Sequence, residues 1–243
     1  MKLSNKTIKL NDKETLFYYR EDSVGDIGVM GQIFNHKDYD ISMYKQGQKL
    51  MEYHNEQSKN RPSLIIDAGA NIGASAVYFA NTYDNSTIFT IEPDSANYKI
   101  LSINTDELKI FNFHGAISDV DGELAFLDPG CSDWGFRTGA IEENKLSIKV
   151  KSISPESILT HPATQNTTPL IFKIDIEGGE EILFKSDVSW LNKFPAVMIE
   201  THDWMLPFSG SSRNFIKAIA QFDFDFLHRG ENIFLFNREI LNT

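Results

Sequence analysis

The chain has 243 residues, and its 23 Lys and Arg against 34 Asp and Glu give a formal net charge of −11. Hydrophobic residues make up 41% of it and charged residues 23%, a globular composition that excludes a disordered or collagen-like chain. The acidic balance argues against a nucleic-acid partner, because neutralising phosphates requires clustered Lys and Arg.

A single cysteine cannot close an intrachain disulfide, so nothing indicates an oxidising compartment. Residues 1–6 lack the apolar run of a secretory signal, and no stretch reaches the roughly 18 apolar residues of a membrane helix. We therefore expect a cytoplasmic protein without a membrane span. The oligomeric state is open, with a homodimer as one alternative.

Residues 1–60 are polar and mixed in pattern, with a short strand expected at 15–20 and a helix at 47–58. We interpret them as an N-terminal extension that is either a lid or a dimerisation element. Residues 61–243 are expected to form the main domain. It carries an inserted loop around 115–169, where short strands at 124–127 and 146–150 bracket an irregular segment.

The main domain alternates strands and helices. Apolar runs predict strands at 63–66, 87–91, 110–114, 170–174 and 196–200. Between or after them, apolar residues at helical spacing predict helices at 74–82, 97–104, 180–185 and 214–222. Residues 224–227 and 233–236 are expected to form a closing hairpin. This order predicts a doubly wound α/β fold, with a parallel sheet and helices on both faces.

The turn after the first of these strands predicts a cofactor site. Ligands of open α/β sheets bind beyond the carboxyl ends of the strands, and glycines let the backbone approach them. The candidate residues are Asp67, Gly69, Asn71 and Gly73. Glu92 closes the next strand, 92 − 73 = 19 residues later, where an acid accepts the hydroxyls of a ribose. A tight turn with a helix-capping carboxylate is the structural alternative.

Charge separates the two cofactor classes that suit such a turn. Asn71 stands where the dinucleotide fingerprint requires glycine, and Asp67 precedes the first glycine. A carboxylate at this place repels a pyrophosphate and attracts the sulfonium or ammonium of S-adenosylmethionine, by ~3 kcal/mol per unit pair at ~5 Å and an effective dielectric of ~20. S-adenosylmethionine is therefore favoured. An NAD-dependent oxidoreductase and a non-catalytic cofactor-binding module are the alternatives.

Three motifs in order carry a family resemblance. They are residues 66–73 (IDAGANIG), 91–94 (IEPD) and 173–178 (KIDIEG), and together they resemble the FkbM-type methyltransferases, class I S-adenosylmethionine-dependent enzymes, from about residue 65 to 200. The resemblance implies a Rossmann-like sheet of seven strands, parallel except for the last. It also implies methylation of a hydroxyl on a sugar, a glycan or a secondary metabolite.

The resemblance further implies which residues contact the cofactor. By position these are Asp67, Gly69 and Gly73 at the methionine part, Glu92 at the ribose, Ser118 and Asp119 near the adenine, and Asp175 and Glu177 facing the methyl group.

Methyl transfer to a hydroxyl is an in-line displacement, and the hydroxyl proton needs an acceptor. Asp175 is the first candidate for that acceptor and Glu177 the second, although Glu177 would also suit a cap on the following helix. His202, after the strand at 196–200, is a third candidate, with a purely structural role as its alternative.

The remaining predictions concern metal and substrate. Asp175 and Glu177 would suit Mg²⁺ or Ca²⁺, but the sequence displays no His/Asp cluster, so no metal is predicted. For the small-molecule or glycan substrate the candidates are Trp134 and Arg137 in the inserted loop, and Glu200, which shares a side with His202 under strand alternation.

Overall fold

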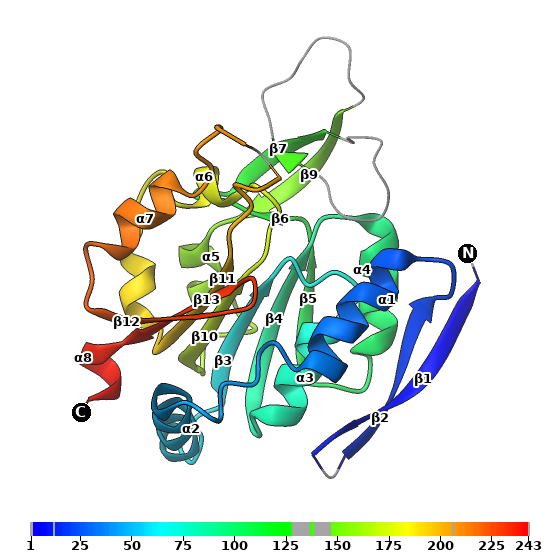
Figure 1. Cartoon of the computed structure of the whole chain (residues 1–243), viewed down its shortest axis with the longest axis horizontal. Helices are drawn as coiled ribbons and strands as arrows, with labels where there is room; N and C mark the ends of the chain where they lie inside the picture. The colour runs from blue at the N-terminus through cyan, green and yellow to red at the C-terminus, as the bar shows by residue number, and fades with distance from the viewer. Residues whose placement is uncertain (1, 12, 128–136, 139–146, 206, 243) are drawn as a thin grey trace.

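The computed structural model describes residues 2–11, 13–127, 137–138, 147–205 and 207–242, with the side chains of 125–148 outside this description. A seven-stranded sheet crosses the molecule (Figure 1). In spatial order its strands are β12 (Phe224–Arg229), β13 (Asn232–Asn237), β11 (Ala196–Glu200), β10 (Thr168–Ile174), β3 (Ser63–Ala68), β4 (Ser86–Glu92) and β5 (Ile110–His114).

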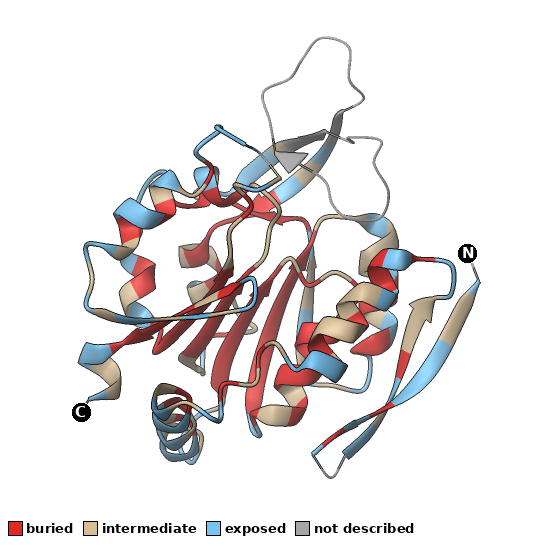
Figure 2. Cartoon of the chain, viewed as in Figure 1, coloured by how far each residue is buried: buried red, intermediate tan, exposed pale blue. Residues whose placement is uncertain are grey.

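The sheet is parallel from β5 to β11, and β13 is antiparallel to both of its neighbours. Among the described strands of this sheet, the last in the chain is therefore the one that is reversed, which confirms the predicted fold class. The residues of β3 and β4 are all buried, and β10 is buried from Leu170 onward (Figure 2). Parallel strands covered on both faces require such continuous apolar runs.

Strand order reverses direction between β3 and β10. The chain moves outward from β3 through β4 to β5, and its later strands continue on the opposite side of β3. Lys173 of β10 lies in register with Asp67 of β3, so the two strands end at the same level. This switch point is where open α/β sheets bind ligands.

Alternate residues of each strand enter two separate cores. Ile65 packs in the core on one face, while Leu64 and Ile66 pack in the other. The first core contains side chains of α2 (Lys45–Gln57), α3 (Ala74–Thr82) and α4 (Ser95–Asn104). The second contains side chains of α5 (Pro155–Thr160), α6 (Glu180–Leu183), the 3₁₀ helix η2 (Ser189–Lys193) and α7 (Arg213–Ile219). A short helix, α8 (Arg238–Leu241), follows the sheet.

The first 60 residues share the first core with the sheet. They form the hairpin of β1 (Leu3–Leu10) and β2 (Lys13–Arg20), then α1 (Val24–Met30), the π-helix η1 (Gly31–His36) and α2. Phe17 and Leu50 are fully buried in that core. The sequence did not predict β1, α1 or η1, and the division of the chain at residue 60 stays a prediction.

The inserted region carries a second sheet, which stands above the main one in Figure 1. Its order is β6 (Ala116–Ile117), β9 (Ser147–Ile153), β7 (Gly122–Leu127) and β8 (Arg137–Thr138). Two of these strands, β7 and β9, correspond to the predicted strands at 124–127 and 146–150. In the described part of the chain, no helix is long and apolar enough to cross a membrane.

Candidate active site

The turns that follow β3 and β10 pack backbone against backbone at the switch point. Gly69 has φ +78°, and a Cβ on it would overlap the carbonyl oxygen of Asp175. The amide of Asp175 donates to the carbonyl of Ala68 at 3.0 Å. Gly69 therefore makes room for the neighbouring acidic turn, a packing requirement that applies whether or not a ligand is bound.

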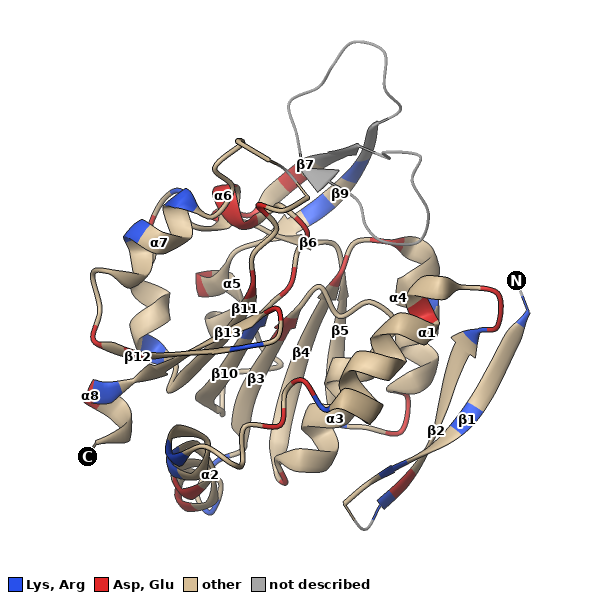
Figure 3. Cartoon of the chain, in the orientation of Figure 1, with Lys and Arg blue, Asp and Glu red and all other residues tan. Residues whose placement is uncertain are grey.

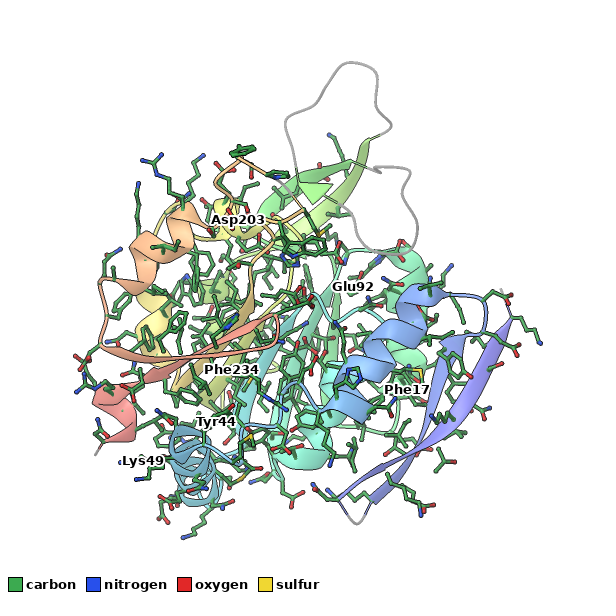
Figure 4. All side chains as sticks on the ribbon, viewed as in Figure 1. Phe17, Tyr44, Lys49, Glu92, Asp203 and Phe234 are labelled. Atoms are coloured by element: carbon green, nitrogen blue, oxygen red, sulfur yellow. The ribbon has the colours of Figure 1, made fainter. Side chains whose placement is uncertain are left out.

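Glu92 is bonded to the same glycine turn from the end of β4. Its Oε2 accepts from the amide of Asn71 at 2.8 Å, and its Oε1 accepts from the amide of Asp94 at 2.8 Å. Burial raises the pKa of Glu92 to about 7, against these hydrogen bonds, which lower it. Figure 4 shows this side chain at the upper ends of the central strands. Asn71 (φ 49°) and Gly73 (φ 92°) both adopt left-handed conformations in the turn.

Asp67 is buried in an ion pair with Lys173 of β10. The Nζ of Lys173 lies 3.1 Å from Oδ1 of Asp67 and donates to the carbonyl of Gly69 at 2.7 Å. Ser75 donates to Oδ2 of Asp67 at 2.6 Å. Both charged side chains are buried, so Lys173 neutralises the Asp67 carboxylate, which the sequence analysis had treated as an unpaired charge. That argument against a pyrophosphate is therefore wrong as it applied to Asp67.

Asp175, Glu200 and His202 converge beyond β10 and β11. The Nε2 of His202 lies 3.5 Å from Oδ1 of Asp175 and 3.6 Å from Oε1 of Glu200, while its Nδ1 lies 2.8 Å from Oε1 of Glu180. Burial lowers the pKa of His202, but the hydrogen bond to Glu180 and the nearby carboxylates outweigh it and raise the pKa to about 9. This is a His/Asp/Glu cluster that the sequence did not reveal.

Two further acids stand in this electrostatic environment, and Figure 3 shows Asp and Glu gathered at these strand ends. Burial, reinforced by the charge of Asp175, raises the pKa of Glu200 to about 7 and that of Glu177 to about 8. Glu177 has φ 49°, and its Oε2 is buried without a hydrogen-bond partner among the described residues. The N-cap of α6 is Gly179, with no side-chain cap, so the capping role considered for Glu177 is wrong.

A pocket lies between these turns and the N-terminal segment. Its lining comes from α1, η1 and the residues after them, the glycine turn, the acidic cluster and β13: Val29, Gln32, Ile33, Asp38, Tyr39, Gly69, Ala70, Asn71, Ser75, Lys173, Asp175, Glu200 and Asn232. Three lining residues are acids, Asp38, Asp175 and Glu200, and the one lysine is already paired with Asp67. The lining therefore carries excess negative charge.

Asn104 of α4 fixes the N-terminal segment to the glycine turn. Its side chain accepts from the amide of Tyr18 at 2.7 Å and donates to the carbonyls of Tyr18 and Ile72, at 2.9 and 2.8 Å. Tyr39, further along the segment, is buried at the pocket, and burial raises its pKa. A lid was one of the two alternatives considered for this segment, but the contact itself had no sequence signal, because it joins residues 86 apart.

Of the predicted residues, Gly69, Asn71, Asp175 and Glu200 line this pocket, and Asp67, Gly73, Glu92, Glu177 and His202 do not. The others lie away from the pocket or outside the description. Ser118 donates to Oδ1 of Asp119 at 3.2 Å, and Oδ2 of Asp119 accepts from Ser186 at 2.6 Å. Neither lines the pocket, and their adenine role stays a prediction. Trp134 lies outside the described residues; Arg137 lies in β8 with its side chain undescribed.

A second pocket, which the sequence did not predict, opens just beyond β11. It is lined by Thr201, Trp204, His228 and Glu231, and the Trp204 side chain is largely exposed. The available signal was position: Trp204 follows the same strand end as Glu200, and Glu231 lies in the turn of the closing hairpin.

Comparison with known proteins places this sequence in a family. The sequence matches the methyltransferase FkbM domain over residues 67–229, more than half of the chain. It matches no curated protein significantly.

Three solved structures illustrate the structural likeness. The FkbM methyltransferase from Methylobacillus flagellatus KT is 17% identical, with a TM-score of 0.45 over 88% of this chain and 59% of its own. WbdD is 12% identical, with a TM-score of 0.43 over 84% of this chain and 43% of its own. A Thermotoga maritima S-adenosylmethionine-dependent O-methyltransferase is 10% identical, with a TM-score of 0.40 over 96% of this chain and 77% of its own.

The chain thus spans less than two thirds of the first two of these structures. The match over residues 67–229 contains both the glycine turn and the acidic cluster. The chain belongs to the FkbM family of S-adenosylmethionine-dependent methyltransferases.

Proposed function

We propose that this chain transfers the methyl group of S-adenosylmethionine to a hydroxyl of a glycan or a small metabolite. The observation that carries the proposal is the position of Asp175, which lines the pocket beside Gly69 and contacts His202. A hydroxyl must lose its proton as it is methylated, so a carboxylate beside the cofactor turn supplies what that reaction needs.

The pocket suits the cofactor by charge. Asp175 and Glu200 give its wall the negative charge that a sulfonium and an ammonium require. In the proposal Gly69, Asn71 and Gly73 line the methionine part, with Asp67 behind them as half of an ion pair. When bound, the cofactor supplies an electrophilic methyl group.

Glu92 is proposed to bind the ribose. Each of its oxygens accepts one backbone amide, which fixes the carboxylate and leaves a second lone pair on each oxygen for a hydroxyl. Burial also limits the rotation of this side chain, so little ordering remains to be done when a ribose binds.

The chain's own residues divide the handling of the proton. His202, with a pKa near 9, is protonated at neutral pH and is therefore a positioning residue for the Asp175 carboxylate. Asp175 orients the acceptor hydroxyl and takes its proton, and Glu177 is the second candidate. A neutral amine attacks the methyl group without first losing a proton, so it would not need this carboxylate. The carboxylate therefore favours hydroxyl methylation over amine methylation.

A glycan acceptor is supported by the second pocket. Trp204 offers an exposed aromatic face beside Thr201, His228 and Glu231, close in sequence to Glu200. Indole rings pack against the apolar faces of sugars while polar neighbours bond the hydroxyls.

The test is methyl transfer from isotopically labelled S-adenosylmethionine to a panel of glycans and hydroxylated metabolites, with products identified by mass spectrometry. Asp175→Asn should weaken cofactor binding, because it removes one of the wall charges, and at saturating S-adenosylmethionine it should still lose about 10²–10⁴-fold in turnover, the usual contribution of a proton acceptor. Transfer to amines alone, or an Asp175→Asn variant with wild-type turnover, would contradict the proposal.

A further inference from the structure

The three side chains beyond β10 and β11 have the spacing of a metal-ligand set. One donor atom from each of Asp175, Glu200 and His202 lies within 4.8 Å of the others. Ligand atoms about 2.1 Å from a shared ion lie roughly 3.0–3.4 Å from one another. The 3.5 and 3.6 Å from His202 Nε2 to the two carboxylates are close to this spacing and long for N–H···O hydrogen bonds.

The orientation of His202 is a second, independent observation. The residue is 3% exposed, and its Nδ1 is held at 2.8 Å by Glu180, which is itself fully buried. A carboxylate on Nδ1 leaves Nε2 as the nitrogen aimed at Asp175 and Glu200. Metal-binding histidines are oriented by a carboxylate on the other ring nitrogen in the same way.

The charges around the cluster are also unbalanced. Asp175, Glu177, Glu180 and Glu200 meet there, and Oε2 of both Glu177 and Glu180 is buried without a hydrogen-bond partner among the described residues. The described cationic groups that face them are His202, which contacts Glu180, and Lys173, which lies 3.6 Å from Asp175 but is shared with Asp67. Buried carboxylates with too few positive partners are costly, and a divalent cation would relieve that cost.

We propose that Asp175, Glu200 and His202 bind one divalent cation of the Mg²⁺ or Mn²⁺ type, with Glu180 orienting the histidine. Two carboxylates and one imidazole suit such an ion and leave coordination positions for water or an acceptor oxygen. Asp175 and Glu200 both line the pocket, so those positions open toward it. On binding, Nε2 coordinates the ion and its proton passes to solvent.

The consequence for catalysis rests on the proposed function, whereas the binding of the ion does not. A hydroxyl on the ion would lose its proton more readily, so Asp175 would act as a ligand and the proton would pass to solvent. Ion binding is therefore measured on the chain alone, without S-adenosylmethionine or acceptor. The outcome of the ion-binding measurement therefore does not depend on whether the chain methylates hydroxyls.

The experiment titrates the purified chain with Mn²⁺ and follows the free ion by electron paramagnetic resonance. The wild type should bind one Mn²⁺ per chain, and Glu200→Gln and His202→Gln should each lower the affinity at least about tenfold. Glu180→Gln, which removes only the orienting carboxylate, should lower it by about 10–100-fold. Glu181→Gln is the matched control, because it removes an exposed carboxylate next to Glu180 that does not belong to the cluster, and it should bind as the wild type does.

A spectroscopic signature separates coordination from a general charge effect. The bound Mn²⁺ should show nitrogen coupling from the imidazole, kept in Glu200→Gln at saturating ion and lost in His202→Gln. Circular dichroism confirms that each variant is folded. No binding up to about 1 mM Mn²⁺, equal affinity of Glu200→Gln and Glu181→Gln, or bound ion without nitrogen coupling would overturn the proposal.

Discussion

Lys173 of β10 and Asp67 of β3 form an ion pair across the switch point, with 3.1 Å between Nζ and Oδ1 and both side chains buried. The strands hold them in register, and the lysine also bonds the carbonyl of Gly69. One pair of side chains therefore connects the sheet to the turn on which the proposed cofactor site is built.

Removing the lysine should expose the cost of a buried, unpaired carboxylate. Lys173→Met should lower the free energy of unfolding by about 3–5 kcal/mol in urea denaturation, because Asp67 remains without its partner. The control is Lys193→Met, which breaks the exposed pair with Glu156 at 2.7 Å and should cost about 0–1 kcal/mol. An equal loss of unfolding free energy in the two variants would contradict this prediction, because it would show that the buried pair matters no more than the exposed one.

Gly69→Ala should lower the stability of the fold far more than the same substitution at Gly230, another glycine with a positive φ. Both Gly69 (φ 78°) and Gly230 (φ 61°) are left-handed, which costs an alanine about 1–2 kcal/mol. A Cβ on Gly69 also overlaps the Asp175 carbonyl, whereas a Cβ on Gly230 meets no atom within 4 Å. Thermal unfolding of Gly69→Ala and Gly230→Ala measures the difference, and similar losses would contradict the close contact of the two turns.

The strands at the switch point followed from sequence because their burial is local and continuous. The predicted strands at 110–114 and 196–200 and the helix at 74–82 have the bounds found in the structure for β5, β11 and α3. The elements before residue 45 were largely missed. Their buried residues, such as Phe17 and Ile33, are scattered through a polar segment and enter the first core only in the folded chain.

The candidate site residues were selected from their positions at strand ends, but the contacts between their side chains were not predicted. Asp175, Glu92 and His202 were identified because each follows a strand. The Glu180 partner of His202 is 22 residues away on a four-residue helix, and no periodicity signals that contact. The charge argument likewise failed at Asp67, because the neutralising Lys173 lies on another strand; the excess negative charge comes from Asp175, Glu200 and Asp38.

Glu177 should make stability depend on pH. Its pKa is raised from 4.5 to about 8, so between these values the folded chain holds a proton that the unfolded chain has lost. Stability from this group is therefore full below about pH 4.5 and is lost as the pH rises through about 8. A tenfold difference in proton affinity between the folded and unfolded chain corresponds to about 1.4 kcal/mol of stability.

Glu177→Gln, which stays neutral, should therefore gain stability over the wild type between pH 5 and pH 9. Melting temperatures at the two pH values measure the gain. Glu181→Gln, on the exposed side of α6, should show none. A Glu177→Gln variant whose difference from the wild type is the same at both pH values would contradict a buried, protonated Glu177.

Trp204 should act on the acceptor and not on the cofactor. Its side chain is 68% exposed at the second pocket, so Trp204→Ala removes a stacking surface without disturbing a core. The KM for the acceptor should rise about tenfold, the equivalent of ~1.4 kcal/mol, while the KM for S-adenosylmethionine stays constant. Ile216→Ala, an exposed residue of α7, is the control; an acceptor KM unchanged by Trp204→Ala would remove this pocket from substrate binding.

The central claim is that the adenosyl cofactor binds at the switch point between β3 and β10. The most direct test is a crystal structure with S-adenosylhomocysteine, which we expect to bind with a micromolar Kd. The claim predicts ribose hydroxyls bonded to Glu92 and the sulfur beside Asp175, over the turn that contains Gly69. Adenosyl density at any other edge of the sheet, or none in crystals soaked at saturating ligand, would contradict it.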